Sequence, residues 1–356
     1  MTMAQSYRWR VQQHGAPDML VREPFEPAAP RPGWARVSLR AMSLNHLDLW
    51  TTKGIEGVKL PLPLTPGCDG AGVLESVGEG AVLPPGVEVG GSVMIAPGLS
   101  CGACAACLRG DDMRCAHYKV LGHLCDGTAA THVFVPVANL LPIPPNWDFA
   151  QAAAFPLVFL TAWEMLHHKA QIQPGETVLV WGGGSGVGSA AIQLVRFLGG
   201  RAIAVVGNDD KAMKCWDLGA EHVINRSRED VAKKVRELTG KRGAEIVFEH
   251  TGVASWPASM AAVARGGRIV TCGATTGYEA SLDLRALFAK QISILGSYMG
   301  RREHLWTMLA HLNRHSTNPS FRPVVERVLP LEDYPEAQRI LEAGQGFGKV
   351  VCVVDP

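Results

Sequence analysis

The residues that constrain the fold most strongly lie between positions 176 and 210, where a short apolar run leads into a dense group of glycines. The run from Thr177 to Trp181 has the length of one buried strand, and glycines follow it at 182, 183, 184, 186 and 188. Apolar residues then recur mostly three or four positions apart as far as Leu198, which is the spacing of one helix face. A second apolar run, Ala202 to Val206, predicts another strand parallel to the first.

Glycines between a strand and a helix have a chemical use as well as a structural one. A pyrophosphate is stabilised by backbone N–H groups at a helix N-terminus, and a side chain on the turn would hold the phosphate away. The strict pattern G-x-G-x-x-G is absent, because Ser185 stands at the second glycine position of the register that ends at Gly188. Such a turn can also serve packing alone, but the strands on both sides favour a dinucleotide-binding unit.

The remaining chain changes its pattern near residue 158. Before this point short strands are expected, and residues 35–41 alternate between apolar and polar as a half-buried antiparallel strand does. Further short strands of this β-rich part are expected at 70–77, 91–95 and 131–135. A last apolar strand is expected from Val350 to Val354.

After residue 158 strands alternate with helices. The six expected strands lie at 177–181, 201–206, 222–224, 245–249, 267–272 and 292–296. Between them, Ser227 is a candidate N-cap for a helix with Val231, Val235 and Leu238 on one face. The sequence therefore predicts an α/β protein, with a β-rich domain and a doubly wound parallel sheet.

Length, composition and charge limit the classes of function that the chain can have. The length of 356 residues predicts two domains, and 47% hydrophobic with 19% charged residues is typical of a globular protein. A net charge of +1 offers no electrostatic attraction for nucleic acid or an anionic membrane surface. The chain shows neither an apolar run of membrane-spanning length nor a signal peptide at its start. A small molecule is the expected partner.

Four of the nine cysteines lie within fifteen residues. Cys101, Cys104, Cys107 and Cys115 have the spacing C-x2-C-x2-C-x7-C, which is typical of a closed tetrahedral zinc site. Four protein ligands leave no position for substrate, so one structural zinc per chain is expected. Buried thiols without metal and an iron–sulfur cluster are the alternatives. A thiolate site of this kind fits a reducing cytoplasm.

These features together resemble the medium-chain dehydrogenase/reductase superfamily, which includes the zinc alcohol dehydrogenases and the quinone oxidoreductases. The cysteine segment is similar to the structural zinc lobe of the alcohol dehydrogenases. PGCDGAGVLESVGEG (66–80) resembles the superfamily's glycine-rich segment, and VLVWGGGSGVGSAAIQL (178–194) resembles its nucleotide loop.

The resemblance covers essentially the whole chain. It implies a GroES-like substrate domain at 1–157, with the zinc lobe at about 98–118, and a return to that domain at 298–356. A Rossmann dinucleotide-binding domain is implied at 158–297, with the nicotinamide held in the cleft. A homodimer or homotetramer is the expected assembly.

Departures from the alcohol dehydrogenases concern their catalytic zinc. That zinc is held by a cysteine in the segment SLNHLDLW, a histidine in the glycine-rich segment and a cysteine before the nucleotide domain. Here Asn45, Cys68 and Leu157 stand at those positions, and Asp69 stands in place of a glutamate. A catalytic zinc needs three protein ligands and an open fourth position. The chain is therefore expected to hold a structural zinc without a catalytic one.

The proton relay of the alcohol dehydrogenases is also replaced, because Leu47 and Trp50 occupy its positions. Asn45 followed three residues later by Asp48 is instead similar to the N-x-x-D of quinone oxidoreductases. Hydride transfer to an activated C=C or C=O bond needs donors where negative charge develops, and the Asn45 amide can donate an N–H there. Asp48, Cys68 and Asp69 complete the candidate catalytic set, with Asp48 expected to order the site.

Other roles stay open for these side chains. Asn45 can be a turn or cap residue, and Cys68 is expected to be a small buried residue. Three histidines are possible proton donors, but each is more often a surface residue or one whose hydrogen bonds are satisfied within the protein. They are His46, His123 and His132. Trp50 and Phe159 are expected to line either a substrate pocket or the core.

The resemblance also implies the cofactor contacts. They are Thr161, Gly183, Gly184, Ser185, Gly186, Val187, Gly188, Asn208, Lys211, Gly273, Ala274 and Ser297. NAD enzymes place a carboxylate at the end of the second nucleotide strand. Val206 stands there, and Lys211 can reach a 2′-phosphate, so NADP(H) is expected over NAD(H). If NADH is preferred instead, Asp209 is the candidate ribose ligand.

Three functions are compatible with the sequence. The first is an NAD(P)H-dependent reductase of enones or quinones without a catalytic zinc. The second is a zinc alcohol dehydrogenase whose atypical metal site uses Cys68, Asp69 and an unassigned third ligand. The third is a non-enzymatic NADPH-binding module.

Overall fold

The computed structural model describes residues 6–317 and 319–354, which divide into two compact units. The first unit comprises 1–157 and 301–356, and the second comprises 158–300. The sequence placed the second boundary at 297, three residues before the observed one. Within the described residues, no helix has the length and apolar character that a membrane span requires.

The second unit is built on a six-stranded sheet in which every pair of neighbours is parallel. Its strands are β10 (Thr177–Val180), β11 (Arg201–Val206), β12 (His222–Asn225), β13 (Ala244–Glu249), β14 (Val263–Thr271) and β15 (Ser293–Gly296). They lie in the order β12-β11-β10-β13-β14-β15. The chain thus starts at the centre, proceeds to one edge and returns to build the other half, which is the Rossmann order. The predicted doubly wound sheet is confirmed.

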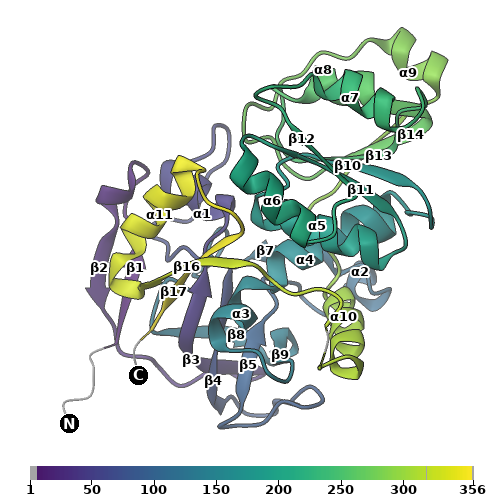
Figure 1. Cartoon of the computed structure of the whole chain (residues 1–356). Helices are drawn as coiled ribbons and strands as arrows, with labels where there is room; N and C mark the ends of the chain where they lie inside the picture. Colours follow the sequence, from purple (N-terminus) through teal and green to yellow (C-terminus); the bar gives the residue numbers. More distant parts are fainter. Residues whose placement is uncertain (1–5, 318, 355–356) are drawn as a thin grey trace. The chain divides into compact units, whose positions relative to one another are not determined.

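Helices cover both faces of this sheet, with α5 and α6 on one face and α7 and α8 on the other (Figure 1). The helices are α4 (Pro156–Trp163), the π-helix η4 (Glu164–Lys169), α5 (Gly186–Phe197), α6 (Asp209–Asp217), α7 (Val231–Leu238), α8 (Trp256–Ala262) and α9 (Leu284–Lys290). The inner strands β10, β11 and β13 read as nearly continuous apolar runs because both of their faces are buried, whereas β15 at the edge of the sheet is partly exposed.

The predicted N-cap of α7 is wrong by three residues. Asp230 caps this helix by accepting a hydrogen bond from the backbone N–H of Lys233. The hydroxyl of Ser227 instead donates to the carbonyl of Gly207 at 2.8 Å, which ties the end of β12 to the end of β11. An aspartate next to the first helical residue is as good a cap as serine, so proximity decides.

The first unit contains a seven-stranded sheet in which β16-β17-β3-β4-β5-β9 lie in order and β8 pairs with β3. Its strands are β3 (Trp34–Ser43), β4 (Asp69–Val77), β5 (Ser92–Ile95), β8 (His132–Pro136), β9 (Leu140–Pro142), β16 (Val325–Pro330) and β17 (Lys349–Val353). Two small sheets pair β1 (Tyr7–Arg10) with β2 (Val21–Pro24) and β6 (Gly98–Leu99) with β7 (Lys119–Val120). The expected β-rich domain is confirmed.

Short helices fill the connections of the first unit. They are η1 (Pro17–Met19), α1 (His46–Lys53), α2 (Ala105–Leu108), η2 (Asp112–Arg114), η3 (Val137–Asn139), α3 (Phe149–Ala154), α10 (Arg302–Arg314), η5 (Leu331–Asp333) and α11 (Tyr334–Ala343). The apolar face of the sheet packs with α11 in one core that includes Leu39, Leu74, Val135 and Tyr334.

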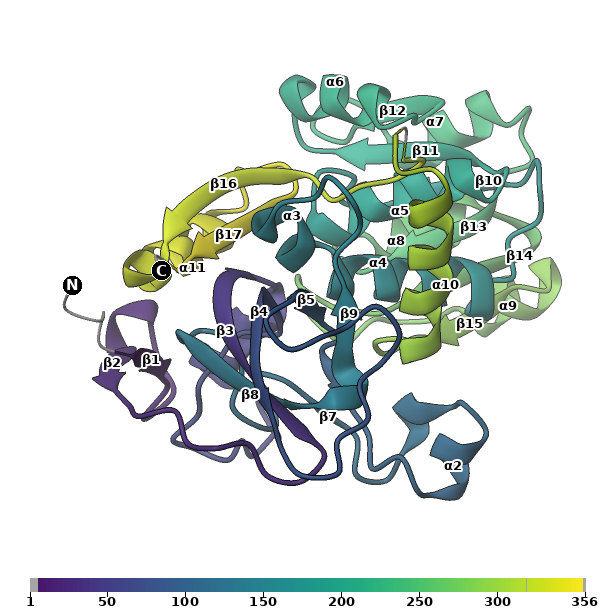
Figure 2. The ribbon, with the colours of Figure 1, turned by 90° about the horizontal axis from the view of Figure 1, so that it is seen from below.

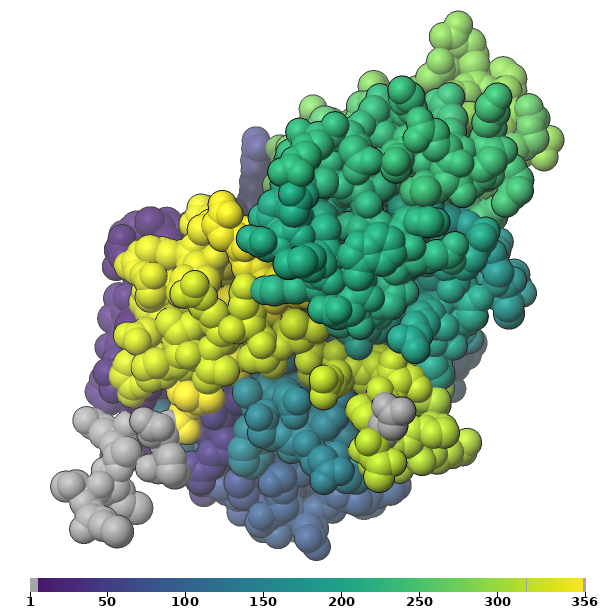
Figure 3. Space-filling view, viewed as in Figure 1, coloured from purple at the N-terminus to yellow at the C-terminus, as the bar shows by residue number. Residues whose placement is uncertain are grey.

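The two ends of the chain meet inside the first unit. β17 pairs antiparallel with β3, with Val351 opposite Ser43, and β4 pairs on the other side of β3, with Asp69 opposite the same Ser43. Figure 2 shows β16 and β17 beside the strands of the N-terminal part, and in Figure 3 the yellow C-terminal surface borders the purple N-terminal one. Residues some 300 positions apart in the sequence therefore share one end of the sheet.

Candidate active site and metal centre

The four predicted zinc ligands form one cluster, which we call the four-cysteine cluster (Cys101, Cys104, Cys107 and Cys115). Their sulfur atoms all lie within 4.8 Å of one another, with separations of 3.8 Å between Cys101 and Cys107 and 3.5 Å between Cys104 and Cys107. Thiolates around a tetrahedral zinc lie about 3.8 Å apart, so the donor set fits this ion. Within residues 6–317 and 319–354, this is the one group of three or more Cys, His, Asp or Glu side chains placed to share a metal ion.

Backbone N–H groups point at these sulfurs. The N–H of Cys104 donates to Cys101 Sγ at 3.4 Å, and that of His117 donates to Cys115 Sγ at 3.3 Å. Hydrogen bonds from the backbone of Ala103 and Cys104 lower the pKa of Cys101 to about 6. These N–H groups favour the thiolate form of Cys101, which is the form that binds metal, whereas burial and the neighbouring Cys104 raise the pKa of Cys107 to about 11.

The four predicted catalytic residues also come together, and they share a buried site with a residue that the sequence did not single out. We call this set the Asn45 cluster (Asn45, Asp48, Cys68, Asp69 and Lys349). Asn45 is the N-cap of α1 and Asp48 lies in its first turn, whereas Asp69 begins β4 and Lys349 begins β17. The residues are 7% exposed for Asn45, 3% for Lys349 and 0% for the other three.

The Asn45 amide lies between the lysine and a carboxylate. The Lys349 ammonium donates to Asn45 Oδ1 at 2.5 Å, and Asn45 Nδ2 donates to Asp69 Oδ2 at 2.9 Å. Nδ2 also donates to the carbonyl of Ser43 at 3.4 Å. Both amide hydrogens thus have acceptors in the chain. Donation to a substrate carbonyl, as the sequence suggested, requires that the longer contact with Ser43 be exchanged.

The two carboxylates are held by further donors. Asp69 Oδ1 accepts from the backbone N–H of Leu157 at 3.0 Å, and Nζ of Lys349 lies 3.6 Å from Asp69 Oδ2. Asp48 accepts from the backbone N–H of Asn45 at 2.7 Å and of Gly67 at 3.1 Å. Such contacts with backbone donors favour the ordering role that the sequence suggested for Asp48.

Burial dominates the electrostatics of the Asn45 cluster. It raises the pKa of Asp48 to about 6, against the opposing effects of the Asn45 N–H and Lys349. It also raises the pKa of Asp69 and lowers that of Lys349, while the attraction between these two opposes both shifts. Burial and the neighbouring carboxylates raise the pKa of Cys68 well above its usual range, so this thiol stays protonated.

The histidines named from the sequence lie outside the Asn45 cluster. His123 Nδ1 lies 3.0 Å from the hydroxyl of Thr51, and His132 Nε2 lies 3.4 Å from Glu75. His46 lies in the first turn of α1 with its ring near Trp50. Lys349 was missed, although a lysine at the start of the apolar strand KVVCV is the signal that could have revealed it.

The glycine turn of the second unit is shaped by close backbone contacts. Ser185 caps α5 and accepts from the N–H of Gly188 at 3.0 Å. A Cβ on Gly188 would lie 2.1 Å from the carbonyl oxygen of Gly182, so no other residue fits. Gly182 has a φ of +56°, and a Cβ there would meet the ring of His250 at 2.8 Å. These contacts fix the turn that leads into the twelve-residue helix α5, and the N-terminus of this helix is where the sequence predicts that a pyrophosphate binds.

The end of β11 carries basic groups. Asn208 caps α6 by accepting from the N–H of Lys211, and Asp209 is bound to the Asn225 amide and the Arg228 guanidinium, each at 2.7 Å. The guanidinium of Arg226 lies over Gly207, at 3.7 Å from the position that a Cβ on this glycine would take. Sequence reasoning missed Arg226, although it directly follows β12.

The remaining cofactor candidates of the second unit lie mostly at the carboxyl ends of strands. Gly273 and Ala274 follow β14, and Ser297 follows β15 with its N–H donating to the carbonyl of Thr271 at 2.8 Å. The Ser297 hydroxyl is buried and has no hydrogen-bond partner among the described residues. Thr161 lies on α4 and is buried. Ligands of open parallel sheets bind at this edge.

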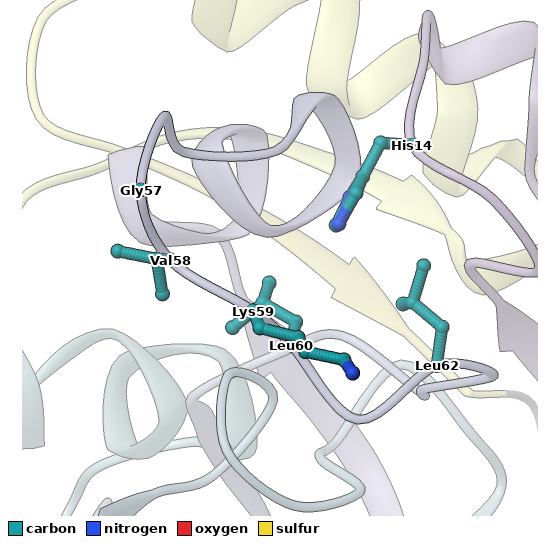
Figure 4. A pocket seen from close by; sticks show the side chains of 6 residues that line it. All are labelled: His14, Gly57, Val58, Lys59, Leu60 and Leu62. Carbon is teal, nitrogen blue, oxygen red and sulfur yellow. The ribbon is translucent and has the colours of Figure 1, made fainter.

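A depression of about 600 Å³ lies elsewhere in the first unit, and the Asn45 cluster is not part of its lining. Figure 4 shows its walls, which are His14, Gly57, Val58, Lys59, Leu60 and Leu62. His14 Nδ1 is 3.1 Å from the carbonyl of Thr51, and most of these residues are exposed. The geometry of the buried cluster, rather than this open surface, matches the chemistry expected from the sequence.

Comparisons with known proteins agree with both units. Residues 31–145 match the alcohol dehydrogenase GroES-like domain, and residues 186–314 match the zinc-binding dehydrogenase family. The chain is 31% identical to a zinc-type alcohol dehydrogenase-like protein of Schizosaccharomyces pombe, over 95% of this chain and 96% of the relative.

Two solved structures illustrate the range of similar proteins. An NAD-dependent alcohol dehydrogenase is 43% identical with a TM-score of 0.92, over 98% of this chain and 100% of the other. The crotonyl-CoA carboxylase/reductase AntE in complex with NADP is 25% identical with a TM-score of 0.88, over 98% of this chain and 94% of the other.

Proposed function

The chain belongs to the medium-chain dehydrogenase/reductase superfamily of zinc-binding, alcohol dehydrogenase-like proteins, and on this premise we propose that it is an NADPH-dependent reductase of enones or quinones. That it is an NAD(P)-dependent oxidoreductase follows from the family itself, which argues against the non-enzymatic alternative. The kind of substrate is the proposal, and the similarity to a crotonyl-CoA reductase supports an activated alkene.

The proposal rests on one observation, which is that the potential metal ligands of the Asn45 cluster are already bound by other groups of the chain. Asp69 is already bound by Leu157, Asn45 and Lys349, and the cation of Lys349 repels a divalent ion from its oxygens. The Cys68 thiol donates to Asp48 Oδ1 at 3.4 Å, so this side chain is also already bound within the cluster. The residues at the positions of the alcohol dehydrogenase zinc ligands therefore fit a second zinc poorly.

Hydrogen-bond donors of the first unit must then stabilise the negative charge that develops during hydride transfer. When NADPH is bound, it supplies the hydride, which suits the β-carbon of an enone because charge then spreads to the carbonyl oxygen. Asn45 is the candidate donor to that oxygen, and Asp48 and Asp69 hold it in place through the N-cap and the amide. An unactivated alcohol is a poorer substrate, since its hydroxyl would have to lose a proton beside the two buried carboxylates Asp48 and Asp69.

An experiment that separates this proposal from a zinc alcohol dehydrogenase combines metal analysis with turnover. We expect one zinc per chain and reduction of an enone by NADPH that survives mild chelation. Two zincs per chain, with alcohol oxidation lost on chelation, would instead favour the second candidate. That candidate is supported by the name of the 43% identical structure and would use Cys68 and Asp69.

The preference for NADPH is supported by the basic groups at the end of β11. Arg226 lies beside Gly207 and Lys211 lies in the first turn of α6, whereas Asp209 is occupied by Asn225 and Arg228 rather than directed at a ribose. The NAD dependence in the name of the 43% identical structure is the contrary observation. Replacing Arg226 by Ala should lower kcat/KM for NADPH by about tenfold or more with little effect on NADH, as a charged contact is worth about 1.5–3 kcal/mol.

The control for this test is Arg242→Ala, which removes an exposed arginine of the same unit away from β11. Equal losses with both cofactors in Arg226→Ala, or a clear NADH preference of the unaltered enzyme, would refute the assignment.

We further infer a homodimer or homotetramer. Strand β15 pairs on one side with β14, and its other edge has no partner strand within the described residues. Nearby Leu284, Phe288 and Tyr298 are 64%, 69% and 53% exposed, which is unusual for large apolar side chains. A monomeric mass in solution would refute this inference.

The thiolate cluster and the nine cysteines without a disulfide within the described residues support a cytoplasmic location.

A further inference from the structure

Lys349 is the cation of the Asn45 cluster, and its burial needs a reason. Lys349 is the first residue of β17 and is 3% exposed. Burial lowers the pKa of its ammonium group. Taking an ammonium group out of water is costly unless charges and acceptors compensate it. Here Asn45 Oδ1 at 2.5 Å and Asp69 Oδ2 at 3.6 Å provide that compensation.

These two contacts determine which way the Asn45 amide faces. An ammonium group only donates hydrogen bonds and a carboxylate only accepts them. Lys349 therefore requires the amide oxygen on its side, and Asp69 requires the amide nitrogen on the other. Without Lys349 the amide oxygen would lose its donor, and the orientation of the N–H group would rest on acceptors alone.

The lysine also offsets charge. Asp48 and Asp69 are both fully buried in the same cluster, and their carboxylates would oppose the growth of negative charge on a nearby carbonyl oxygen. The attraction of Asp69 and Asp48 raises the pKa of Lys349, against the lowering effect of burial. One buried cation among two carboxylates reduces that opposition.

We propose that Lys349 is a positioning residue for hydride transfer, which holds the Asn45 amide in one orientation and offsets the charge of Asp69. This inference rests on the proposed reductase function. It assigns to a side chain of β17 part of the electrostatic role that a metal cation would otherwise fill beside Asn45 and Asp69.

The test compares Lys349→Met with Asn45→Ala and the combined variant. Lys349→Met should lower kcat on an enone by about tenfold to hundredfold. The dissociation constant of NADPH should stay within about twofold, since its candidate contacts lie in the other unit. The combined variant should be no slower than the slower single variant, because both changes remove one function. The control Lys53→Met, which removes an exposed lysine paired with Glu342 on the same unit, should leave kcat unchanged.

If Lys349→Met does not fold, Asp69→Asn combined with Lys349→Met removes both charges and restores a foldable site. Its kcat should remain at least tenfold below that of the unaltered enzyme. Full recovery of kcat would show that Lys349 does not hold the Asn45 amide and would overturn its assignment as a positioning residue, as would independent, multiplicative losses in Asn45→Ala and Lys349→Met.

Failure of the proposed function is distinguishable from failure of this inference. An unaltered enzyme that reduces no enone or quinone refutes the former alone. The inference on Lys349 is then tested by unfolding. The midpoints are compared among the unaltered chain, the two single variants and the combined variant. Non-additive shifts support a direct coupling of Lys349 with Asn45, and additive shifts overturn it.

Discussion

The four-cysteine cluster and the Asn45 cluster are polar sites of the same unit, but they are assembled in opposite ways. The first draws its ligands from fifteen consecutive residues, is partly exposed and brings together thiols that need an added cation. The second joins the starts of two strands and a helix N-terminus, is buried, and carries its own cation in Lys349. A site with an internal cation has no electrostatic need of a metal, whereas four clustered thiolates repel one another until a metal binds.

The largest effect is expected from breaking the four-cysteine cluster. Cys104→Ser should reduce zinc from about one ion per chain to nearly none and lower the melting temperature by about 10 °C or more, because metal ligation contributes folding free energy. Zinc analysis and thermal unfolding measure both. Cys125→Ser, which removes a half-buried thiol outside the cluster, is the control. Full zinc content in Cys104→Ser would contradict the assignment.

Breaking the internal ion pair should come second. Asp69→Ala leaves the Lys349 ammonium buried without its carboxylate, and this should cost about 3–5 kcal/mol of the free energy of unfolding. Glu75→Ala is a matched control on the same strand, because its ion pair with Arg36 is half-exposed and should contribute about 1 kcal/mol or less. Zinc content should stay at one ion per chain in both variants. Equal stability losses would mean that the buried pair is no stronger than a surface pair.

A smaller free-energy change is expected in catalysis. Asn45→Ala should lower kcat on an enone by about a hundredfold or less while the affinity for NADPH stays the same. Asn139→Ala also removes a buried amide of this unit, which donates to the carbonyls of Ala96 and Gly98. That control should lose stability but not kcat. Unchanged turnover in Asn45→Ala would remove this residue from the mechanism.

The smallest effect concerns pH. Asp48 has a pKa raised to about 6 in the folded protein from a usual value of 3.8, so the folded state binds more protons than the unfolded state between these values. Its contribution to stability is therefore present below pH 3.8 and is lost as pH rises toward 6. The stability difference between the unaltered protein and Asp48→Asn should be about 1–2 kcal/mol larger at pH 4.5 than at pH 7.

Urea unfolding at the two pH values measures this difference. The four-cysteine cluster should respond with the opposite sign, because its ligands must be deprotonated to bind zinc and acid weakens that binding. A pH-independent difference between the unaltered protein and Asp48→Asn would show that the Asp48 carboxyl does not titrate in this range.

Local patterns in the sequence were sufficient for most of the fold. The apolar runs of the second unit predicted its six strands, most clearly where both faces of a strand are buried, and β11, which is one of these, has the bounds that were expected. The cap of α7 was misplaced because serine and aspartate both serve at that position, and only the position of the Gly207 carbonyl explains what Ser227 does. Arg226 was missed because its relation to Gly207 depends on the parallel pairing of β11 with β12.

The sequence by itself determined the four-cysteine cluster, the glycine turn before α5 and the identity of Asn45, Asp48, Cys68 and Asp69 as one candidate site. Each depends on residues a few positions apart or on a motif that resembles a known family. The tertiary structure alone decided that Lys349 joins them. The reason is the antiparallel pairing of β17 with β3, which brings residue 349 to within hydrogen-bonding distance of residue 45, and no local pattern records a pairing between strands so far apart in the chain.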